Sequence, residues 1–376
     1  MADSIPVSGS ALAPFERVRD AFVQNLESGD DLGASFAVFV HGEKVVDLIG
    51  GYADRARAAP WTEETLACLY SSGKAAAAML IARAASDGLL DYDAPVADLW
   101  PEFAQGGKGG ITVAEALSHQ GGLCGFPDEM PPEEWLDAAA IAARLGRMAP
   151  LWPPGSASGY HPQTFGFIAN EIHRRATGRT IGVTLREDFC EPYGLSLFCG
   201  MREEEIARAA YMPKPPRAPG LGPITPLKEY AFLKPWSAPG RVAREAWMAA
   251  ELPASNTHAD ARSLAEIVQP FANGGLFRGE RILSSDATEQ ALAERINGDD
   301  LVLPFHLSWA AGLMRNVNAH FGPSQSAYGH AGFGGSAVVI DPAHGLTAAY
   351  VMNKMSPHLV GDPRSLRLIN AVYDVL

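Results

Sequence analysis

Residues 69–82 of the 376-residue chain read Leu-Tyr-Ser-Ser-Gly-Lys-Ala-Ala-Ala-Ala-Met-Leu-Ile-Ala. Alanine, leucine and methionine favour helix, so this composition predicts a helix from Ser71 to about Asp87, ended by Gly88. Ser71 and Lys74 are three residues apart, and one helical turn brings both side chains to the same face. A serine at the start of a helix lies at the positive end of the helix dipole, which stabilises a developing alkoxide. The stretch is therefore a candidate serine nucleophile with a lysine beside it.

The same spacing also suits a serine that caps the helix and a lysine that faces solvent. Lys74, however, is followed by four alanines and by Met79-Leu80-Ile81, a composition typical of a buried helix. Lysines are rare at buried positions unless they have a partner. Burial or a nearby cation would lower the pKa of Lys74 and allow it to act as a base.

Two other stretches contain residues that suit an active site. Residues 153–162 form a loop rich in proline and glycine that contains Tyr160, whose phenol can face a cleft or pack as an ordinary aromatic. Residues 328–336 read Tyr-Gly-His-Ala-Gly-Phe-Gly-Gly-Ser and precede a predicted strand. Small residues let a substrate approach the backbone there, and a free N–H can bind an oxyanion. A glycine-rich tight turn is the alternative.

Outward from these segments, β-type sequence lies at both ends of the chain. Residues 35–40 and 44–49 predict a hairpin, and residues 336–340 and 346–352 predict two further strands. Helical patterns cover residues 15–28, 259–272 and 365–376. The predicted fold is α/β (α+β), an antiparallel sheet flanked by the terminal helices, with a mostly helical second lobe. We expect residues 1–90 and 225–376 to form the sheet lobe and residues 91–224 the helical lobe, with the active site between them.

The middle of the chain has several helix signals and one long irregular segment. Thr112 is expected to cap a helix at 113–117, Pro131-Pro132 to open another, and 165–177 to form a third that ends at Gly178. Residues 213–240 contain eight prolines, which predicts an irregular segment that covers a site.

Composition narrows the possible partners. Hydrophobic residues make up 47% of the chain and charged residues 19%, an ordinary globular balance. The net charge is −13 and the pI about 5.2, so no basic surplus exists to bind nucleic acid or an anionic membrane. Apolar runs such as 75–82 are shorter than the ~20 residues of a membrane span. We therefore expect neither nucleic acid nor a membrane as a partner, and the oligomeric state stays open.

The sequence gives no sign of a metal or cofactor. Cys68, Cys124, Cys190 and Cys199 show no Cys-x-x-Cys spacing, and we expect them to be small buried hydrophobes. Neither His-Glu-x-x-His nor Gly-x-Ser-x-Gly occurs. Residues 106–109, Gly-Gly-Lys-Gly, lack the context of a phosphate loop and predict a surface turn. The first ten residues make a poor secretion signal, so a cytoplasmic location is expected.

In their order along the chain, these segments resemble the serine hydrolases of the class C β-lactamase group, especially the family VIII carboxylesterases. The resemblance covers most of the chain. The matching segments are Ser71-Ser72-Gly73-Lys74, residues 87–96, residues 111–123, Tyr160-His161-Pro162, residues 172–179, residues 255–258 and residues 330–336.

The resemblance implies a cleft between a sheet lobe and a helical lobe and assigns roles within it. Ser71 would be the acylated nucleophile, and Lys74 and Tyr160 would share the proton that it loses. The backbone N–H groups of Ser71 and Phe333 would hold the oxyanion. His330, Gly332 and His161 would bind substrate or support the site. Whether lysine or tyrosine is the immediate base stays open.

Two departures from the lactamase pattern bear on the substrate. Pro162 stands where the lactamases have asparagine, and His330 stands where they have a lysine that binds the antibiotic carboxylate. Histidine is mostly neutral near pH 7. Both changes favour a cofactor-free carboxylesterase for small, short-acyl esters. A β-lactamase, a D-amino peptidase or an acyltransferase on the same scaffold is the alternative, and a non-catalytic binding protein is a third.

Overall fold

The computed structural model describes residues 5–234 and 242–376. Within these residues, nine strands form one antiparallel sheet in the order β1-β3-β2-β14-β13-β12-β11-β10-β9. The strands are β1 (Val7–Ala11), β2 (Gly33–Val40), β3 (Glu43–Gly51), β9 (Ile296–Asp299), β10 (His306–Trp309), β11 (Met314–Arg315), β12 (Tyr328–Ala331), β13 (Ala337–Asp341) and β14 (Leu346–Met352). Strands β2 and β14 pair along their lengths, so the two ends of the chain meet at the centre of the sheet.

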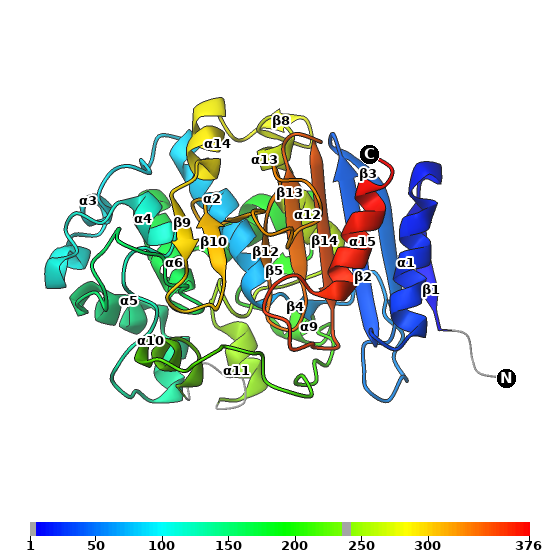
Figure 1. The fold of residues 1–376 in the computed structure, drawn as a ribbon, viewed down its shortest axis with the longest axis horizontal. Helices are drawn as coiled ribbons and strands as arrows, with labels where there is room; N and C mark the ends of the chain where they lie inside the picture. The colour runs from blue at the N-terminus through cyan, green and yellow to red at the C-terminus, as the bar shows by residue number, and fades with distance from the viewer. Residues whose placement is uncertain (1–4, 235–241) are drawn as a thin grey trace.

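Helices bury both faces of this sheet (Figure 1). On one face lie α1 (Glu16–Glu27) and α15 (Pro363–Tyr373), and on the other lie α2 (Lys74–Ser86), α12 (Ala261–Ile267) and α13 (Gln269–Ala272). Strand β2 alternates between two hydrophobic clusters: Phe36 and Val38 pack towards α1 and α15, whereas Ala37 and Phe39 pack towards α2 and α12. Burial on both faces explains why β2 is apolar throughout.

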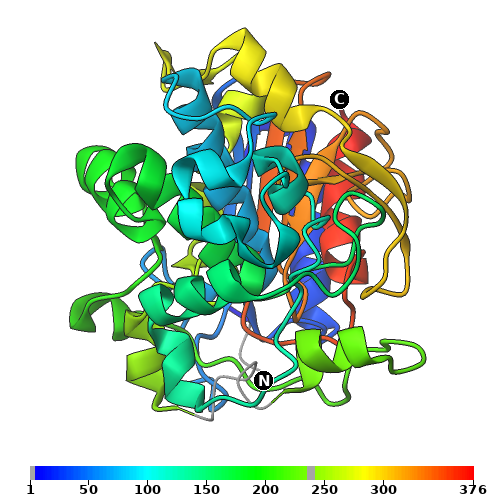
Figure 2. The ribbon, with the colours of Figure 1, turned by 90° about the vertical axis from the view of Figure 1, so that its left-hand side faces the viewer.

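The middle of the chain forms a helical layer on the α2 side, and Figure 2 views the molecule from that layer with the sheet behind it. Its elements are β4 (Ala67–Cys68), η2 (Tyr70–Gly73), α3 (Val96–Leu99), η3 (Pro101–Gly107), α4 (Val113–Leu117), η4 (Pro132–Leu136), α5 (Ala138–Arg147), α6 (Thr164–Thr177), α7 (Ile181–Leu185), η5 (Arg186–Cys190), α8 (Glu191–Tyr193), β5 (Leu197–Phe198), α9 (Glu203–Ile206), α10 (Pro226–Lys228), η6 (Glu229–Leu233), α11 (Arg244–Ala249) and β6 (His258–Ala259). The remaining elements are β7 (Leu276–Phe277), β8 (Glu280–Arg281) and α14 (Ser285–Leu292).

Most elements expected from the sequence are present, and the predicted fold class is confirmed. Thr112 caps α4 in a capping box with Glu115, and Gly178 ends α6 in the left-handed conformation. Strands β9–β12 were not predicted, because they are short and β9 is the polar sequence Ile-Asn-Gly-Asp. The division into residues 1–90 with 225–376 and residues 91–224 stays a prediction.

The structure differs in detail from three of the sequence-based expectations. The helix expected from Ser71 begins as the 3₁₀ turn η2 and becomes α-helical only at Lys74. The irregular segment 213–240 contains the short helical turns α10 and η6, and residues 235–241 lie outside the described residues. In the turn at 106–109 the three glycines are exposed as expected, but Lys108 is fully buried because three backbone carbonyls accept hydrogen bonds from its ammonium.

The cysteines and the search for membrane spans complete the description. All four cysteines are free and buried, as the sequence predicts. Across the described residues, no helix combines the length and the apolar character that crossing a membrane requires.

Candidate active site

Ser71 and Lys74 lie on consecutive turns, Ser71 in η2 and Lys74 at the start of α2. The Lys74 Nζ atom is 2.7 Å from Ser71 Oγ. Tyr70, directly before the serine, has a φ of 46°, in the left-handed region that residues other than glycine rarely adopt. Strain of this kind persists where the surroundings hold the backbone in place, and it occurs often at active sites.

Lys74 is completely buried and has no carboxylate partner among the described residues. Besides Ser71 it contacts the carbonyl oxygens of Pro162 at 2.9 Å and of Ala254 at 3.3 Å. Burial lowers the pKa of Lys74 well below its usual value. A neutral amine has two N–H groups and one lone pair. The two carbonyls suit the N–H groups, and the Ser71 hydroxyl suits the lone pair.

Tyr160 reaches the same serine from the loop before α6. Its hydroxyl forms a hydrogen bond with the Ser71 side chain, and Lys74 Nζ is 5.1 Å from the centre of its ring. The ring stacks on Trp309 of β10 at 5.8 Å with 8° between the planes, and it meets the edge of His119 at 4.9 Å. Burial raises the pKa of Tyr160 far above its usual value. The structure thus brings together the three residues that the sequence singled out.

A buried carboxylate holds the Tyr160 loop in place. Asp300 accepts hydrogen bonds from Tyr160 N at 2.9 Å, from Ser158 Oγ at 3.0 Å and from the N–H groups of Val302 and Leu303. Four donors satisfy this carboxylate, although burial raises its pKa. Sequence reasoning missed Asp300, because its partners in the site loop, Ser158 and Tyr160, are 142 and 140 positions away in the chain.

His161 supports the same loop and does not line the cavity beside Ser71. Its Nδ1 atom donates to Gly159 O at 2.6 Å, and its Nε2 atom accepts from Leu123 N at 2.9 Å. This pair of contacts fixes one neutral tautomer, and burial lowers the pKa of His161 to about 3. The His161 ring therefore holds the backbone of the Tyr160 loop against the segment at Leu123.

Hydroxyl groups join the turn after β12 to the turn that contains Ser71. Ser72 Oγ is 2.9 Å from Ser336 Oγ, and both hydroxyls lie 2.8 Å from the carbonyl oxygen of Leu69. Gly332 lies so close that a Cβ there would be 2.1 Å from that same oxygen, so only glycine fits. We call Ser72, Ser336 and the Leu69 carbonyl the serine clamp. It joins the turn that contains Ser71 to the turn that contains Phe333.

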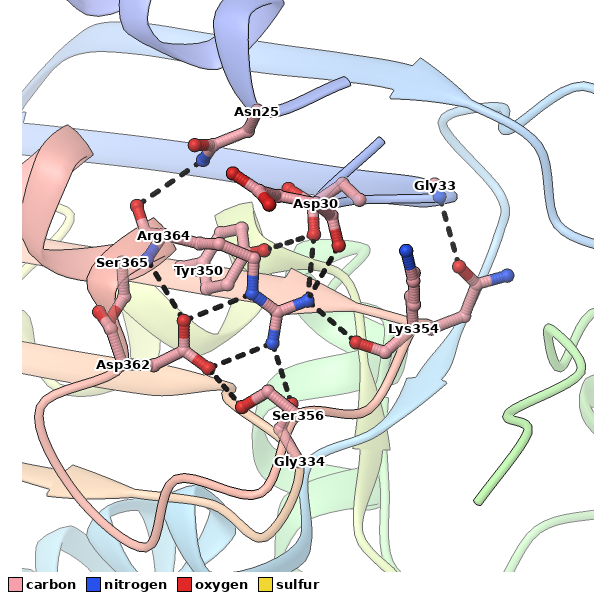
Figure 3. A network of polar contacts seen from close by, with 12 residues as sticks. Asn25, Asp30, Gly33, Gly334, Tyr350, Lys354, Ser356, Asp362, Arg364 and Ser365 are labelled. Carbon is pink, nitrogen blue, oxygen red and sulfur yellow. Dashed lines mark hydrogen bonds and ion pairs between the residues drawn. The ribbon is translucent and has the colours of Figure 1, made fainter. Parts of the chain in front are cut away.

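Arg364 of α15 contacts the backbone of the turn that contains Phe333 (Figure 3). Its guanidinium donates to the Gly334 carbonyl at 2.8 Å, to both oxygens of Asp362 at 2.8 and 3.0 Å, and to Asp31 at 3.0 Å. A Cβ at Gly335, whose φ is 122°, would collide with this guanidinium at 2.2 Å. Phe333 is thus fixed between the serine clamp and a buried ion-pair network.

His330, which is expected to bind substrate or to support the site, lies on β12 beside Tyr160, and its role stays a prediction. It is fully buried, its ring centre is 6.0 Å from that of Tyr160, and it is not among the residues that line the cavity. Its Nδ1 atom bonds to Ala331 O at 3.0 Å, within its own turn. Burial, together with Lys74, lowers the pKa of His330 to about 3, so the ring is neutral.

A cavity of about 650 Å³ opens beside Ser71. Tyr160, Phe333 and Tyr70 line it near the serine. Its other walls are mainly apolar, and the residues in and near the irregular segment contribute many of them. The part of the chain that the structure describes contains no group of three His, Cys, Asp or Glu side chains that could hold a metal ion.

Comparison with known proteins places the chain in a family. The family model described as Beta-lactamase matches residues 18–371. The chain belongs to the β-lactamase family. It is therefore a serine hydrolase of the β-lactamase family, and the resemblance inferred from the sequence motifs is confirmed.

Relatives within this family include esterases and a penicillin-binding homologue. The chain is 32% identical over 375 residues to the Esterase/beta-lactamase LipL of Mycobacterium tuberculosis, covering 94% of this chain and 84% of LipL. A penicillin-binding protein homologue from Caulobacter crescentus is 50% identical, with a TM-score of 0.95 over 99% of this chain and 100% of that one. A structure described as a family VIII carboxylesterase is 37% identical, with a TM-score of 0.92 and the same coverage.

Proposed function

We propose that this β-lactamase-family protein is a serine carboxylesterase that hydrolyses small, short-acyl esters through an acyl-enzyme on Ser71. The observation that carries the proposal is the 2.7 Å contact between Ser71 Oγ and the buried Lys74 amine, with the Tyr160 hydroxyl bonded to the same oxygen. This contact gives the serine hydroxyl a neutral base within hydrogen-bond reach. The esterase names of two relatives support the ester as substrate class.

Lys74 is the group that receives the proton in this proposal. Burial shifts the pKa of Lys74 downward, which favours the neutral amine, and that of Tyr160 upward, which favours the neutral phenol. The lone pair is then on Lys74. Ser71 Oγ attacks the ester carbonyl and Lys74 takes its proton. The carbon–oxygen bond to the alcohol then breaks, and the proton passes through Tyr160 to the departing alkoxide.

A water molecule completes the cycle by the same route. It attacks the acyl carbon, gives a proton to the Lys74–Tyr160 pair and releases the acid, and Ser71 regains its hydrogen. The N–H groups of Ser71 and Phe333 are proposed to stabilise the negative oxygen in both steps. The serine clamp supports this assignment, because it fixes the two turns that carry these N–H groups.

Hydrolysis of β-lactams is the second candidate, because the name of one relative includes that activity. A lactam carboxylate bound by a cation gains a charge-assisted hydrogen bond. The corresponding position holds His330, which is buried and neutral, and Pro162 lacks a side-chain amide. We therefore expect short p-nitrophenyl esters to exceed a chromogenic cephalosporin in kcat/KM by at least roughly two decades, about 2.7 kcal/mol.

Replacement of the nucleophile tests the proposal. Ser71→Ala is expected to lose essentially all turnover of p-nitrophenyl acetate and butyrate while its free energy of unfolding falls by about 1 kcal/mol or less. A serine-directed phosphonate should add its mass to the wild type and not to the variant. Ser10→Ala, an exposed position on β1, is the matched control. Wild-type turnover in Ser71→Ala would remove Ser71 from the mechanism, and a wild type inactive on every ester would favour a binding protein.

A further inference from the structure

The cavity beside Ser71 is larger than a short-acyl ester requires. Its volume of about 650 Å³ lies within the ~300–1,000 Å³ range of pockets that enclose drug-sized ligands. Its walls include Met212, Phe232, Trp247, Met314 and Leu359, which are all apolar or aromatic. If the acyl group is short, most of this volume belongs to the alcohol part of the substrate, and that part must be largely apolar.

The charged residues of the cavity all have one sign. Among the described residues that line it, the charged ones are Lys214, Arg217 and Arg244, and no aspartate or glutamate lines it. The whole protein has a net charge of −13, so a cationic lining is not a consequence of average composition. Residues 210–244 contain six lysines and arginines and one acidic residue, Glu229.

These three cations have no carboxylate partner among the described residues. The ion pairs of the structure involve other residues, and the side-chain hydrogen bond of Arg244 goes to the carbonyl of Ala209 at 3.4 Å. All three side chains are exposed to solvent, whereas Ser71 is half-buried. The cations therefore stand where the cavity opens, and the serine lies deeper.

An aromatic wall connects Arg244 with the reaction centre. Arg244 begins α11, and Trp247 follows one helical turn later. The Trp247 ring lies 6.4 Å from that of Tyr70, which in turn lies 5.5 Å from the ring of Phe333. A substrate that reaches from Ser71 to Arg244 would pass along these three rings, so its middle part must be apolar and its end must be able to pair with a cation.

Lys214 and Arg217 lie on a second segment that is anchored to the body of the protein. Tyr211 N donates to Ala53 O at 2.9 Å, and Met212 packs against both hydrophobic clusters. The segment that follows is thereby held against the cavity. Arginine and lysine on two segments can approach one anionic group from different sides.

We propose that the substrate is a short-acyl ester whose alcohol part is apolar along its length and ends in a carboxylate that pairs with Lys214, Arg217 and Arg244. This inference rests on the proposed function, because it assigns the two halves of an ester that Ser71 cleaves. Hydrolysis then releases a short carboxylic acid and a hydroxy acid. The carboxylate lies at the far end of the cavity from Ser71, so it differs from a carboxylate next to the scissile bond.

Two substrates that differ only at the far end test the proposal. They are 4-(4-acetoxyphenyl)butanoate and its primary amide, which share the acetyl group and the phenol leaving group. We expect kcat/KM for the carboxylate to exceed that for the amide about tenfold in ~0.01 M salt, and the ratio to fall towards one in ~1 M NaCl, where charges are screened beyond roughly 3 Å. Equal values at low salt would overturn the carboxylate proposal and leave the esterase proposal intact.

Charge-removing variants identify the cations responsible. The triple variant Lys214→Gln, Arg217→Gln, Arg244→Gln is expected to lower the carboxylate-to-amide ratio to about one. A matched triple variant, Arg17→Gln, Lys44→Gln, Arg281→Gln, changes the net charge equally at residues that do not line the cavity, and it should keep the wild-type ratio. A preference that survives in the first variant, or disappears in the second, would contradict the assignment.

The two proposals fail in different ways. Failure of the esterase proposal would appear as no turnover of either substrate together with no labelling of Ser71. Should the triple variant not fold, the salt dependence of the wild-type ratio still decides the carboxylate proposal. A ratio above one that does not change with salt would contradict it, because attraction between exposed charges weakens with ionic strength.

Discussion

Lys74 and Lys108 are both completely buried, and both are surrounded by backbone carbonyls, yet their surroundings suit different protonation states. Lys108 donates to the carbonyls of Gln105, Gly146 and Met148, which use all three N–H groups of an ammonium. Lys74 has two carbonyls, and its third partner is the hydroxyl of Ser71. Burial lowers the pKa of both, to about 8 for Lys108. The third partner, rather than burial or a lowered pKa, separates the proposed base from a structural cation.

Paired substitutions should separate the two lysines most clearly. Lys74→Met is expected to lower kcat by the ~10²–10⁴-fold typical of losing a general base. Lys108→Met should leave kcat per folded molecule unchanged, because Lys108 does not line the cavity. It should lower the free energy of unfolding by about 1–3 kcal/mol, because buried carbonyls lose their donor. Ester hydrolysis rates and chemical denaturation measure these effects. Equal losses of activity in the two variants would contradict the assignment of Lys74 as the base and Lys108 as a structural cation.

A double-mutant cycle tests whether Lys74 acts together with Tyr160. Tyr160→Phe keeps the ring on Trp309 and removes the hydroxyl bonded to Ser71, so we expect a loss of about 10²-fold or more in kcat. Combined with Lys74→Met, the loss should be much smaller than the product of the two single losses, since groups that act as a unit are not additive. Multiplicative losses would mean that the two residues work independently.

The free energy of unfolding, measured as a function of pH, tests the protonation state of Lys108. Its pKa is about 8 in the folded protein and near its usual 10.5 in the unfolded chain. Between these values the unfolded chain binds a proton that the folded protein lacks, so rising pH favours folding. Relative to Lys108→Met, the wild type should gain about 2–3 kcal/mol of unfolding free energy across this pH range. A constant difference would show that Lys108 keeps its usual pKa.

The smallest effect is expected at His330. With its pKa lowered to about 3, its ring carries no charge between pH 5 and 8. His330→Gln should therefore leave the acid limb of the kcat/KM profile in this range unmoved, because we attribute that limb to the proposed Lys74–Tyr160 pair. Profiles measured on one p-nitrophenyl ester for wild type and variant decide this. A displaced limb would place His330 in the proton pathway.

The features that the sequence predicts best are those set by residues close to one another along the chain. Ser71 and Lys74 are three positions apart, and the alanine-rich helix after them indicates burial. The strands β2 and β14 are predictable because both of their faces are buried, which leaves continuous apolar runs. The resemblance implies that His161 and Gly332 bind substrate or support the site, and these roles stay predictions. In the structure His161 bonds to the backbone of Gly159 and Leu123, and Gly332 lies against the Leu69 carbonyl.

Other parts of the site depend on contacts between distant residues and leave no local pattern. Ser72 and Ser336 are 264 positions apart, and neither stands out among the serines of the chain. Asp300 and Arg364 look like ordinary surface residues in the sequence, yet both are nearly or fully buried and bind the backbone of a site loop. Lys108 was predicted on a surface turn because glycines surround it in the sequence. Two of the three carbonyls that it contacts, those of Gly146 and Met148, are about 40 positions away and leave no local pattern.

The pairing of β2 with β14, and of Arg364 with the turn at Gly334, determines when the protein can become active during its synthesis. Ser71 and Lys74 leave the ribosome early, but the turn that contains Phe333 and the arginine that supports it follow more than 250 residues later. Contacts of such long sequence separation form slowly, since a long loop must close first. A nascent chain that ends before residue 364 would carry Ser71, the proposed nucleophile, without the finished site, so a partly made enzyme is expected to be inactive.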